Sequence, residues 1–368
     1  MEKGLKIEQI AKICGELIAK RDPEEALEYV EDNLKKIPKI SLHKIHGNLI
    51  AELNKDAEQT LIFCGHLDVT PPGNMEKWKY DPFSGKMIEY DKDIVIFGRG
   101  AADMKGGITV LLTVMSVLAQ KIPSLHVLMI FTTDEESGGY NGTRKLLDMI
   151  PPAIGCFIPE PTGLKHFSLG EKGELMATIS NKEKNRVKEE VERIAKSSTL
   201  TLHSELKDIF EHSENFFTLF GFEEKINAFY ISREERIDND RTYIQIEIPY
   251  LTDCFRVLDF VNLLADFNII VQDYVPPTLT SPASFIVKTL MKSSYTILGE
   301  SALPLFFPCS SEAPFFRQMG IPTVLYGPGE TVLAHNTNEF VRASSILKGS
   351  QIYLETIDAL SELCNIQT

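Results

Sequence analysis

Seven ionisable residues, spread over most of the chain, have the types and spacing of a paired metal centre. Imidazoles and carboxylates bind divalent cations, and a further carboxylate can act as a general base toward an attacking water. Each of the seven follows, or nearly follows, an apolar run typical of a buried strand. Open α/β sheets gather their chemistry at the carboxyl ends of strands, so these residues could converge on one pocket. They are His66, Asp68, Asp103, Glu135, Glu136, Glu160 and His335.

The first pair, His66 and Asp68, is separated by a single residue at the end of an apolar run. Residues two apart in a strand point to the same face, so one side chain could bind a metal ion while the other holds the second imidazole nitrogen. On its own, such a pair is more typical of exposed polar groups that cap a turn.

Asp103 lies in a glycine-rich segment directly before an apolar helical pattern. One interpretation is a carboxylate that bridges two cations, and the other is a phosphate cradle at a helix N-terminus. Gly98 and Gly100 begin a dinucleotide fingerprint, but Asp103 occupies its third glycine position, and no Gly-Lys-Ser/Thr follows. A carboxylate there repels phosphate and attracts metal, which favours the metal site.

Four further residues complete the predicted site. Glu135 and Glu136 follow the apolar run 126–132, where a turning chain can direct two neighbouring carboxylates at one site, one as ligand and one as base. Glu160 stands between two prolines, and His335 lies on a loop after another apolar run. Each alone is more typical of a polar surface or a turn. Their conjunction at strand ends predicts metal binding.

Composition limits the classes of function. The 368-residue chain has a net charge of −14, which argues against a nucleic-acid partner because phosphate contacts need basic surfaces. No apolar run approaches the roughly 20 residues of a membrane span. The charged N-terminus lacks the apolar core of a signal peptide, so a cytoplasmic protein is expected. The six cysteines include no Cys-x-x-Cys pair, which argues against a thiolate zinc site or a disulfide framework.

Alternating strand and helix patterns predict a three-layer α/β/α domain, interrupted by a more charged α+β module. The expected strands of the first part are 48–53, 60–64, 93–97, 126–132 and 156–158, and its helices are 7–19, 23–34, 107–119 and 143–149. The module has helices at 186–196 and 254–267, a hairpin of 226–232 with 243–248, and a strand at 268–274. After Pro276-Pro277 come a helix at 284–294, a strand at 322–326 and a helix at 344–363. Metal motifs fall on both sides of the module, so residues 1–172 and 277–368 are expected to form the catalytic domain and residues 173–276 an inserted lid.

The ordered motifs resemble the co-catalytic zinc family of acetylornithine deacetylase, succinyl-diaminopimelate desuccinylase and aminoacylase. The similarity rests on His-x-Asp-x-x-Pro, Gly-Arg-Gly-Ala-Ala-Asp-Met-Lys-Gly, Asp-Glu-Glu, Glu-Pro-Thr and Gly-Pro-Gly…Ala-His, and is strongest over residues 60–171 and 304–340. It implies a hydrolase of linear amides with two divalent metal ions, zinc first and cobalt or manganese as alternatives. It also implies a ferredoxin-like lid that can form a homodimer.

The resemblance gives each residue a role. One ion would be held by His66, Asp103 and Glu160, and the other by Asp103, Glu136 and His335. Glu135 would take a proton from the attacking water and pass it to the leaving amine, while Asp68 would orient His66. The peptide bond between Asp103 and Met104 is expected to be cis.

The substrate is predicted from residues 308–315, which resemble the acetylornithine deacetylase branch. A negative Glu312 would suit a cationic substrate side chain, whereas desuccinylase relatives tend to carry an arginine nearby, which suits a carboxylate. The expected small-molecule substrate is therefore an N-acetylated basic amino acid. The alternative is that Glu312 only caps the helix that follows it.

The lid departs from the family pattern. Relatives carry His-Ser/Ala-Ser-x-Pro after the first lid strand, and its histidine helps to hold the oxyanion, but residues 174–180 run straight into charged residues here. His203 comes later and lacks the proline. Loss of one oxyanion donor costs about 10²–10³-fold in rate. The hypotheses are therefore a deacetylase, a desuccinylase, a dipeptidase or carboxypeptidase of the same family, and a non-catalytic binding relative.

Overall fold

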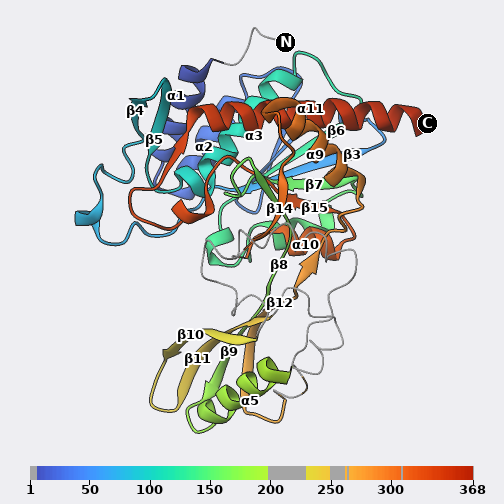
Figure 1. The fold of residues 1–368 in the computed structure, drawn as a ribbon. Coiled ribbons are helices and arrows are strands. Elements are labelled where there is room, and N and C mark those ends of the chain that lie inside the picture. Colours follow the sequence, from blue (N-terminus) through green and yellow to red (C-terminus); the bar gives the residue numbers. More distant parts are fainter. Residues whose placement is uncertain (1–5, 198–228, 249–261, 263–264, 308–309, 368) are drawn as a thin grey trace. The chain divides into compact units, whose positions relative to one another are not determined.

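The computed structural model describes residues 6–197, 229–248, 262, 265–307 and 310–367 (Figure 1). The chain divides into two compact units, each assembled from segments that are distant in sequence. The first unit contains Met1–Ser168, Ala283–Leu303 and Phe315–Thr368. The second contains Leu169–Pro282 and Pro304–Pro314.

The first unit is built on a mixed sheet with a parallel centre. Its strands in spatial order are β1 (Ser41–Ile45), β2 (Asn48–Leu53), β6 (His126–Thr132), β3 (Thr60–His66), β7 (Gly155–Ile158), β15 (Thr323–Leu325) and β8 (His166–Glu171). Strands β6, β3, β7 and β15 are parallel, and β1, β2 and β8 pair antiparallel. Every residue of β3 and β6 is buried, as expected for central strands that are covered on both faces.

Helices cover both faces of this sheet, which confirms the predicted three-layer architecture. Adjacent residues of a strand point to opposite faces. Phe63 of β3 makes an edge-to-face contact with Tyr353, whereas the next residue, Cys64, contacts Thr143 of the short helix α4. The helices are α1 (Ile7–Ile18), α2 (Pro23–Leu34), α3 (Gly106–Leu118), α4 (Thr143–Leu146), α9 (Phe285–Leu298), α10 (Ala313–Gln318) and α11 (Ala343–Gln367). Asp22 caps α2, because its carboxylate accepts the N–H of Glu24.

A second, three-stranded sheet in the first unit has the order β16-β5-β4, where β4 is Lys86–Tyr90, β5 is Asp93–Phe97 and β16 is Phe340–Arg342. Both pairings are antiparallel. The strand that precedes the Asp103 loop therefore belongs to a separate small sheet and not to the central one. Sequence analysis missed its partners, because β4 is mostly exposed and β16 has only three residues.

The second unit contains a four-stranded antiparallel sheet in the order β10-β11-β9-β12 and the helix α5 (Lys184–Ser197). The strands are β9 (Gly173–Ser180), β10 (Tyr230–Arg236), β11 (Arg241–Ile248) and β12 (Ile269–Val275). Apolar residues of β9 and β11 pack with Val187 and Val191 of α5. This is the predicted α+β arrangement. The predicted hairpin also forms, but its first strand, β10, continues to Arg236 rather than ending at 232. The expected helix 254–267 lies almost wholly outside the described residues.

Strand β8 continues past Ser168 into the second unit, where Gly170 and Glu171 pair with β13 (Thr278–Leu279). Strand β14 (Leu303–Phe307) also pairs with β8. Neither β8 nor β14 is predicted by the sequence pattern.

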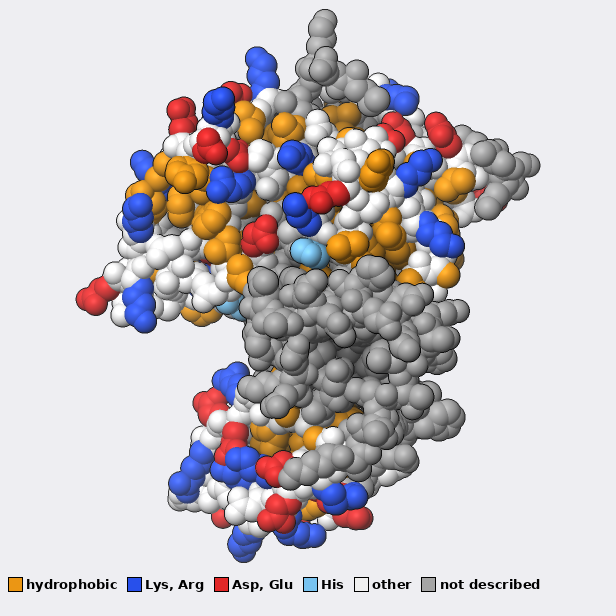
Figure 2. All heavy atoms as spheres, viewed as in Figure 1, with side chains coloured by type: hydrophobic (Ala, Val, Ile, Leu, Met, Phe, Trp, Pro, Cys, Tyr) orange, Lys and Arg blue, Asp and Glu red, His pale blue; other side chains and the backbone are white. Residues whose placement is uncertain are grey.

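One stretch of the chain, Ala101–Leu118, is long and apolar enough to cross a membrane by length and composition alone, which sequence analysis overlooked. However, 83% of this stretch is buried inside the protein, as in the core helix of a water-soluble fold. On the face drawn in Figure 2, acidic and basic side chains are interspersed with small groups of apolar ones over the described surface.

Candidate metal centre

Four neighbouring parallel strands place most of the predicted site residues at one edge of the sheet. His66 is the last residue of β3, and Glu135 and Glu136 form the short turn η3 (Glu135–Ser137) that follows β6. Glu160 comes two residues after β7. His335 follows β15 through the turn η5 (Thr331–Leu333). The carboxyl ends of parallel strands meet at the same edge, so residues as far apart in the sequence as His66 and His335 reach one place.

Asp103 arrives from outside this sheet, on the loop between β5 and α3. The loop turns at Gly100, whose φ of 84° favours glycine, and a Cβ there would lie 2.6 Å from Val69 Cγ1. The distorted turn η2 (Ala101–Lys105) then carries Asp103 in an extended conformation, with φ −121° and ψ 97°. The Asp103–Met104 peptide is cis, which confirms the prediction.

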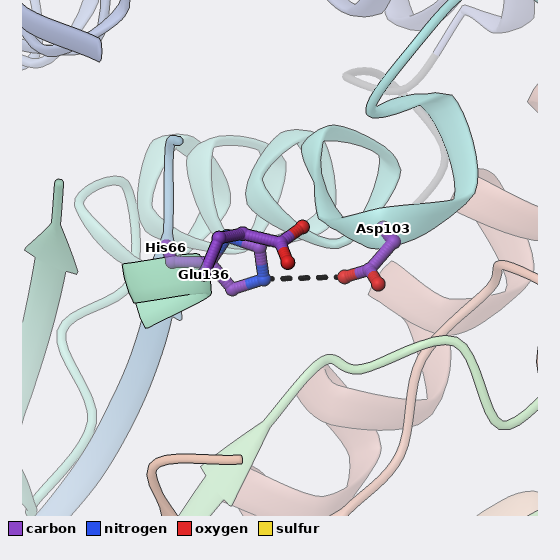
Figure 3. A group of neighbouring side chains, drawn as sticks. All are labelled: His66, Asp103 and Glu136. Carbon is purple, nitrogen blue, oxygen red and sulfur yellow. Dashed lines mark hydrogen bonds and ion pairs between the residues drawn. The ribbon is translucent and has the colours of Figure 1, made fainter. Parts of the chain in front are cut away.

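The side chains form two groups that share Asp103. Oδ1 of Asp103 lies 3.1 Å from Nε2 of His66, which is 3.9 Å from Oε1 of Glu160. Oδ2 of Asp103 lies 3.1 Å from Nε2 of His335, which is also 3.1 Å from Oε1 of Glu136. Figure 3 shows His66 and Glu136 directed toward Asp103. One carboxylate thus presents a separate oxygen to each histidine.

Asp68 holds three residues of the site in place. Its backbone carbonyl lies 3.0 Å from Nδ1 of His66, and its carboxylate lies 3.5 Å from the same nitrogen. The two carboxylate oxygens accept the backbone N–H groups of Glu135, at 3.1 Å, and Glu136, at 2.9 Å. With Nδ1–H engaged in this way, Nε2 of His66 is the nitrogen left to bind a cation.

Glu135 lies beside His66, as far from its Nε2 as Glu160 is. Its Oε2 is 3.9 Å from Nε2 of His66. This places a further carboxylate next to the site where a water would be activated, as a general base requires.

The histidines and carboxylates of the site shift one another's pKa values. Burial opposes protonation of His66, but hydrogen bonds with Asp103 and Asp68 outweigh it and raise the pKa of the imidazole well above its ordinary value. Hydrogen bonds to Asp103 and Glu136 raise the pKa of His335 to about 10, against a smaller opposing effect of burial. Burial alone would raise the pKa of Asp103, yet the two histidines hold it below its ordinary value. The centre therefore favours ionised carboxylates and attracts positive charge.

The donor set fits a pair of divalent cations. In the described part of the chain, His66, Asp103 and Glu136 each offer a ligand atom, and these atoms lie within 4.8 Å of one another. A bridging carboxylate with one histidine and one glutamate on each side suits two closely spaced ions. The individual roles as ligand and base stay predictions.

Two further residues were predicted to take part in catalysis or substrate choice, Glu312 and His203. Glu312 belongs to the second unit and is fully buried. The hydroxyl of Ser311 accepts the N–H of Ala313 at the start of α10, so a capping contact there comes from Ser311. His203, the suggested substitute for the missing lid histidine, lies outside the described residues.

A buried pair that was not predicted from the sequence lies behind the site: Arg99 and Glu339, which are 2% and 0% exposed. Their nearest approach, between Nη1 of Arg99 and Oε2 of Glu339, is 2.7 Å. Arg99 stands in the glycine-rich motif that carries Asp103, and Glu339 follows His335 by four residues. The sequence did contain one indication of this pair, because each of the two charged residues lies four positions from a predicted metal ligand.

Comparison with known proteins places these motifs in one family. The profile of peptidase family M20/M25/M40 matches residues 62–359. Two curated succinyl-diaminopimelate desuccinylases are similar: that of Wigglesworthia glossinidia brevipalpis is 37% identical over 135 residues, and that of Rhodospirillum centenum 36% over 143 residues. The matches cover 34% and 36% of this chain and only 35% and 36% of those proteins. The chain thus matches about a third of the length of these relatives.

Solved structures share the fold over nearly the whole chain. A metallo-carboxypeptidase of the M20 family from Sulfolobus solfataricus has a TM-score of 0.73, at 19% identity, over 97% of this chain and 99% of that one. Human carnosine dipeptidase 1 has a TM-score of 0.72, at 15% identity, over 97% of each chain. A dinuclear metal-binding peptidase of the M20 family from Bacillus subtilis has a TM-score of 0.63, at 13% identity, over 97% and 98%.

Proposed function

Because the chain belongs to peptidase family M20/M25/M40, we propose that it is a metal-dependent hydrolase that cleaves the amide bond of a small N-acyl amino acid. The observation that carries this proposal is the pair of ligand groups that share Asp103, with Glu135 beside them. Two divalent cations, when bound, would lower the pKa of an attacking water toward about 7 and stabilise negative charge on the amide oxygen. Zinc is the first candidate, and cobalt or manganese would suit the same ligands.

The chain's own residues would move the proton. Glu135 takes it from the attacking water and holds it on its carboxylate, then delivers it to the amide nitrogen as that nitrogen leaves as an amine. Asp68 keeps Glu135 in place through the backbone N–H that it accepts. His66, Asp103, Glu136, Glu160 and His335 hold the two cations.

For the acyl group, the curated relatives favour succinyl. Both reported relatives are named succinyl-diaminopimelate desuccinylase, so an N-succinyl amino acid is the first substrate to test. The sequence-based preference for an N-acetylated basic amino acid depended on the charge of Glu312. Because Glu312 is fully buried, its carboxylate gives that preference little support. N-acetylornithine is the second substrate to test.

Hydrolysis of a dipeptide, or of the C-terminal residue of a peptide, is a further candidate, since the structural neighbours include a dipeptidase and a carboxypeptidase. A non-catalytic binding protein would have no need of Glu135, whose position beside His66 therefore supports an enzyme. The proposal retains residues 173–276 as a lid that can form a homodimer, residues 1–172 and 277–368 as the catalytic domain, and a cytoplasmic location.

The proposal is tested on protein that has been stripped with a chelator and reloaded with zinc. Release of free amine is measured from N-succinyl-diaminopimelate, N-acetylornithine and a dipeptide, with the stripped protein as control. Zinc-dependent cleavage of the succinyl substrate is expected. Preference for another substrate would support the proposed hydrolase but show that succinyl is not its preferred acyl group. If two bound zinc ions supported no cleavage at all, the enzymatic proposal would be wrong.

A further inference from the structure

We propose that Arg99 and Glu339 are positioning residues that fix the Asp103 loop against the His335 loop and so set the spacing between the two halves of the metal centre. This inference rests on the proposed function, because it concerns how the two ion sites are held together. Neither residue touches a predicted reacting atom, so both act through the backbone of the ligands.

The buried carboxylate of Glu339 accepts several backbone hydrogen bonds from the Asp103 loop. Its Oε1 accepts the N–H groups of Ala102, at 2.8 Å, and Asp103, at 3.0 Å. Its Oε2 accepts the N–H of Gly100, at 3.0 Å, and the guanidinium of Arg99. A glutamine could not replace it, because an amide NH₂ would face N–H donors in place of one of these oxygens.

Arg99 extends this network to the other loop. Its guanidinium donates to the backbone carbonyl of His335, at 3.1 Å, and to that of Asn336, at 3.3 Å. A single planar fork therefore contacts Glu339 and the chain on which His335 lies. A lysine would keep the positive charge, but its single ammonium group cannot reproduce the fork.

The backbone of His335 needs such support. Its φ is 60°, a left-handed conformation that is uncommon outside glycine and persists where surrounding contacts hold it. The contact from Arg99 to the carbonyl of this same residue supplies one of them. The orientation of the imidazole relative to Asp103 thus depends on Arg99.

The small sheet explains why the two loops meet. Strands β5 and β16 are antiparallel, with Phe97 opposite Phe340, and the N–H of Gly98 donates to the carbonyl of Glu339 at 2.9 Å. The Asp103 loop leaves this end of the ladder, and the His335 loop enters it. The Arg99–Glu339 pair extends the ladder toward the metal centre.

The opposite end of the same ladder provides a matched control. There Asp93, at the start of β5, accepts the backbone N–H and the hydroxyl of Ser344, which follows β16. This carboxylate also joins the β5 and β16 segments, but its contacts do not include a predicted ligand. Asp93→Asn should therefore perturb the small sheet without changing the metal centre.

Trp78 offers a local probe, because it is the one tryptophan of the chain. The Arg99 guanidinium lies 5.3 Å from the centroid of its ring, within the range of a cation–π contact. The emission of Trp78 therefore reports whether the group at position 99 keeps its place.

The experiment titrates cobalt(II) into chelator-stripped wild type, Arg99→Lys, Glu339→Gln and Asp93→Asn, all as full chains. The visible absorption of cobalt reports coordination, and thermal unfolding and Trp78 emission report the fold. Wild type and Asp93→Asn should bind two ions with the same spectrum. Arg99→Lys should bind the ion at His335 at least about tenfold more weakly, with an altered cobalt spectrum and Trp78 emission, and Glu339→Gln should weaken both ions.

The outcomes separate this inference from the proposed function. Failure of the wild type to bind two cobalt ions would contradict the proposed metal centre, and with it the proposed function. Two ions in the wild type, with unchanged affinities and spectra in Arg99→Lys and Glu339→Gln, would overturn the positioning role alone. Loss of cooperative unfolding in both variants, but not in Asp93→Asn, would also overturn it, because the pair would then be needed for folding rather than for placing the ligands.

Discussion

The backbone N–H of Glu136 donates to Oδ2 of Asp68 at 2.9 Å, although the two residues follow different strands of the sheet. Oδ1 of the same carboxylate accepts the N–H of Glu135, and the backbone carbonyl of Asp68 contacts Nδ1 of His66. Asp68 therefore positions a predicted base and two predicted ligands, which is more than its expected role of orienting His66.

Replacement of Asp68 by Asn should lower kcat by about 10–100-fold, because an amide cannot accept both N–H groups and one of them would lose its partner. Steady-state kinetics on the best substrate checks this, with exposed Asp56→Asn as the matched control. Activity equal to that of the control would show that Asp68 has no positioning role.

Glu135→Gln should lower kcat by about 10²–10⁴-fold while both metal ions stay bound, because glutamine keeps the shape of the side chain but cannot accept the proton. Elemental analysis of the purified variant measures the metal content alongside the kinetics. Exposed Glu89→Gln should behave like the wild type. Substantial activity in Glu135→Gln would assign the base elsewhere.

Metal binding should release protons near neutral pH. In stripped protein, hydrogen bonds to Asp103 and Glu136 raise the pKa of His335 to about 10, so a cation must displace its proton. Metal affinity should therefore increase as the pH rises toward 10. Calorimetric titration in two buffers of different ionisation enthalpy counts the protons. Equal heats in both buffers at pH 7 would contradict this prediction.

The same shift has an opposite consequence for the stability of the stripped protein. The pKa of His335 is higher in the folded state than the value of about 6.5 expected in the unfolded state. Its ion pairs therefore stabilise the fold fully below about pH 6.5, and this contribution is lost as the pH rises toward 10. His335→Ala should remove this part of the pH dependence.

Gly107→Ala should destabilise the protein by about 1–3 kcal/mol, because the added Cβ would lie 2.2 Å from the carbonyl oxygen of Pro159. Pro159 precedes Glu160, so metal affinity should fall as well. Gly349→Ala in α11 is the matched control, since its Cβ would meet Leu164 and Val110 at 3.4 Å. Equal thermal unfolding temperatures in the two variants would contradict the close approach of α3 and Pro159.

The sequence predicted most strands of the central sheet, and it predicted that His66, Glu135, Glu136 and Glu160 would meet at the ends of those strands. His66 ends a fully buried, mostly apolar strand and Glu135 follows another, and such runs are recognisable without a partner strand. The small sheet was missed because β16 has only three residues and pairs with a strand more than 240 positions away. The Arg99–Glu339 pair was missed for the same reason, since its meaning appears only when that pairing is known. In the second unit, the predicted helix and strand patterns agree with α5 and β11. Each of these two elements buries one apolar face and exposes a more polar one, which is the pattern recognisable in the sequence.

The most direct test of the shared carboxylate is the number of metal ions per chain in wild type, His335→Ala and Asp103→Ala. Two ions are expected in the wild type, one in His335→Ala and none at comparable affinity in Asp103→Ala, because both ions would lose the ligand that they share. A single ion in the wild type, or two in Asp103→Ala, would contradict a centre bridged by Asp103.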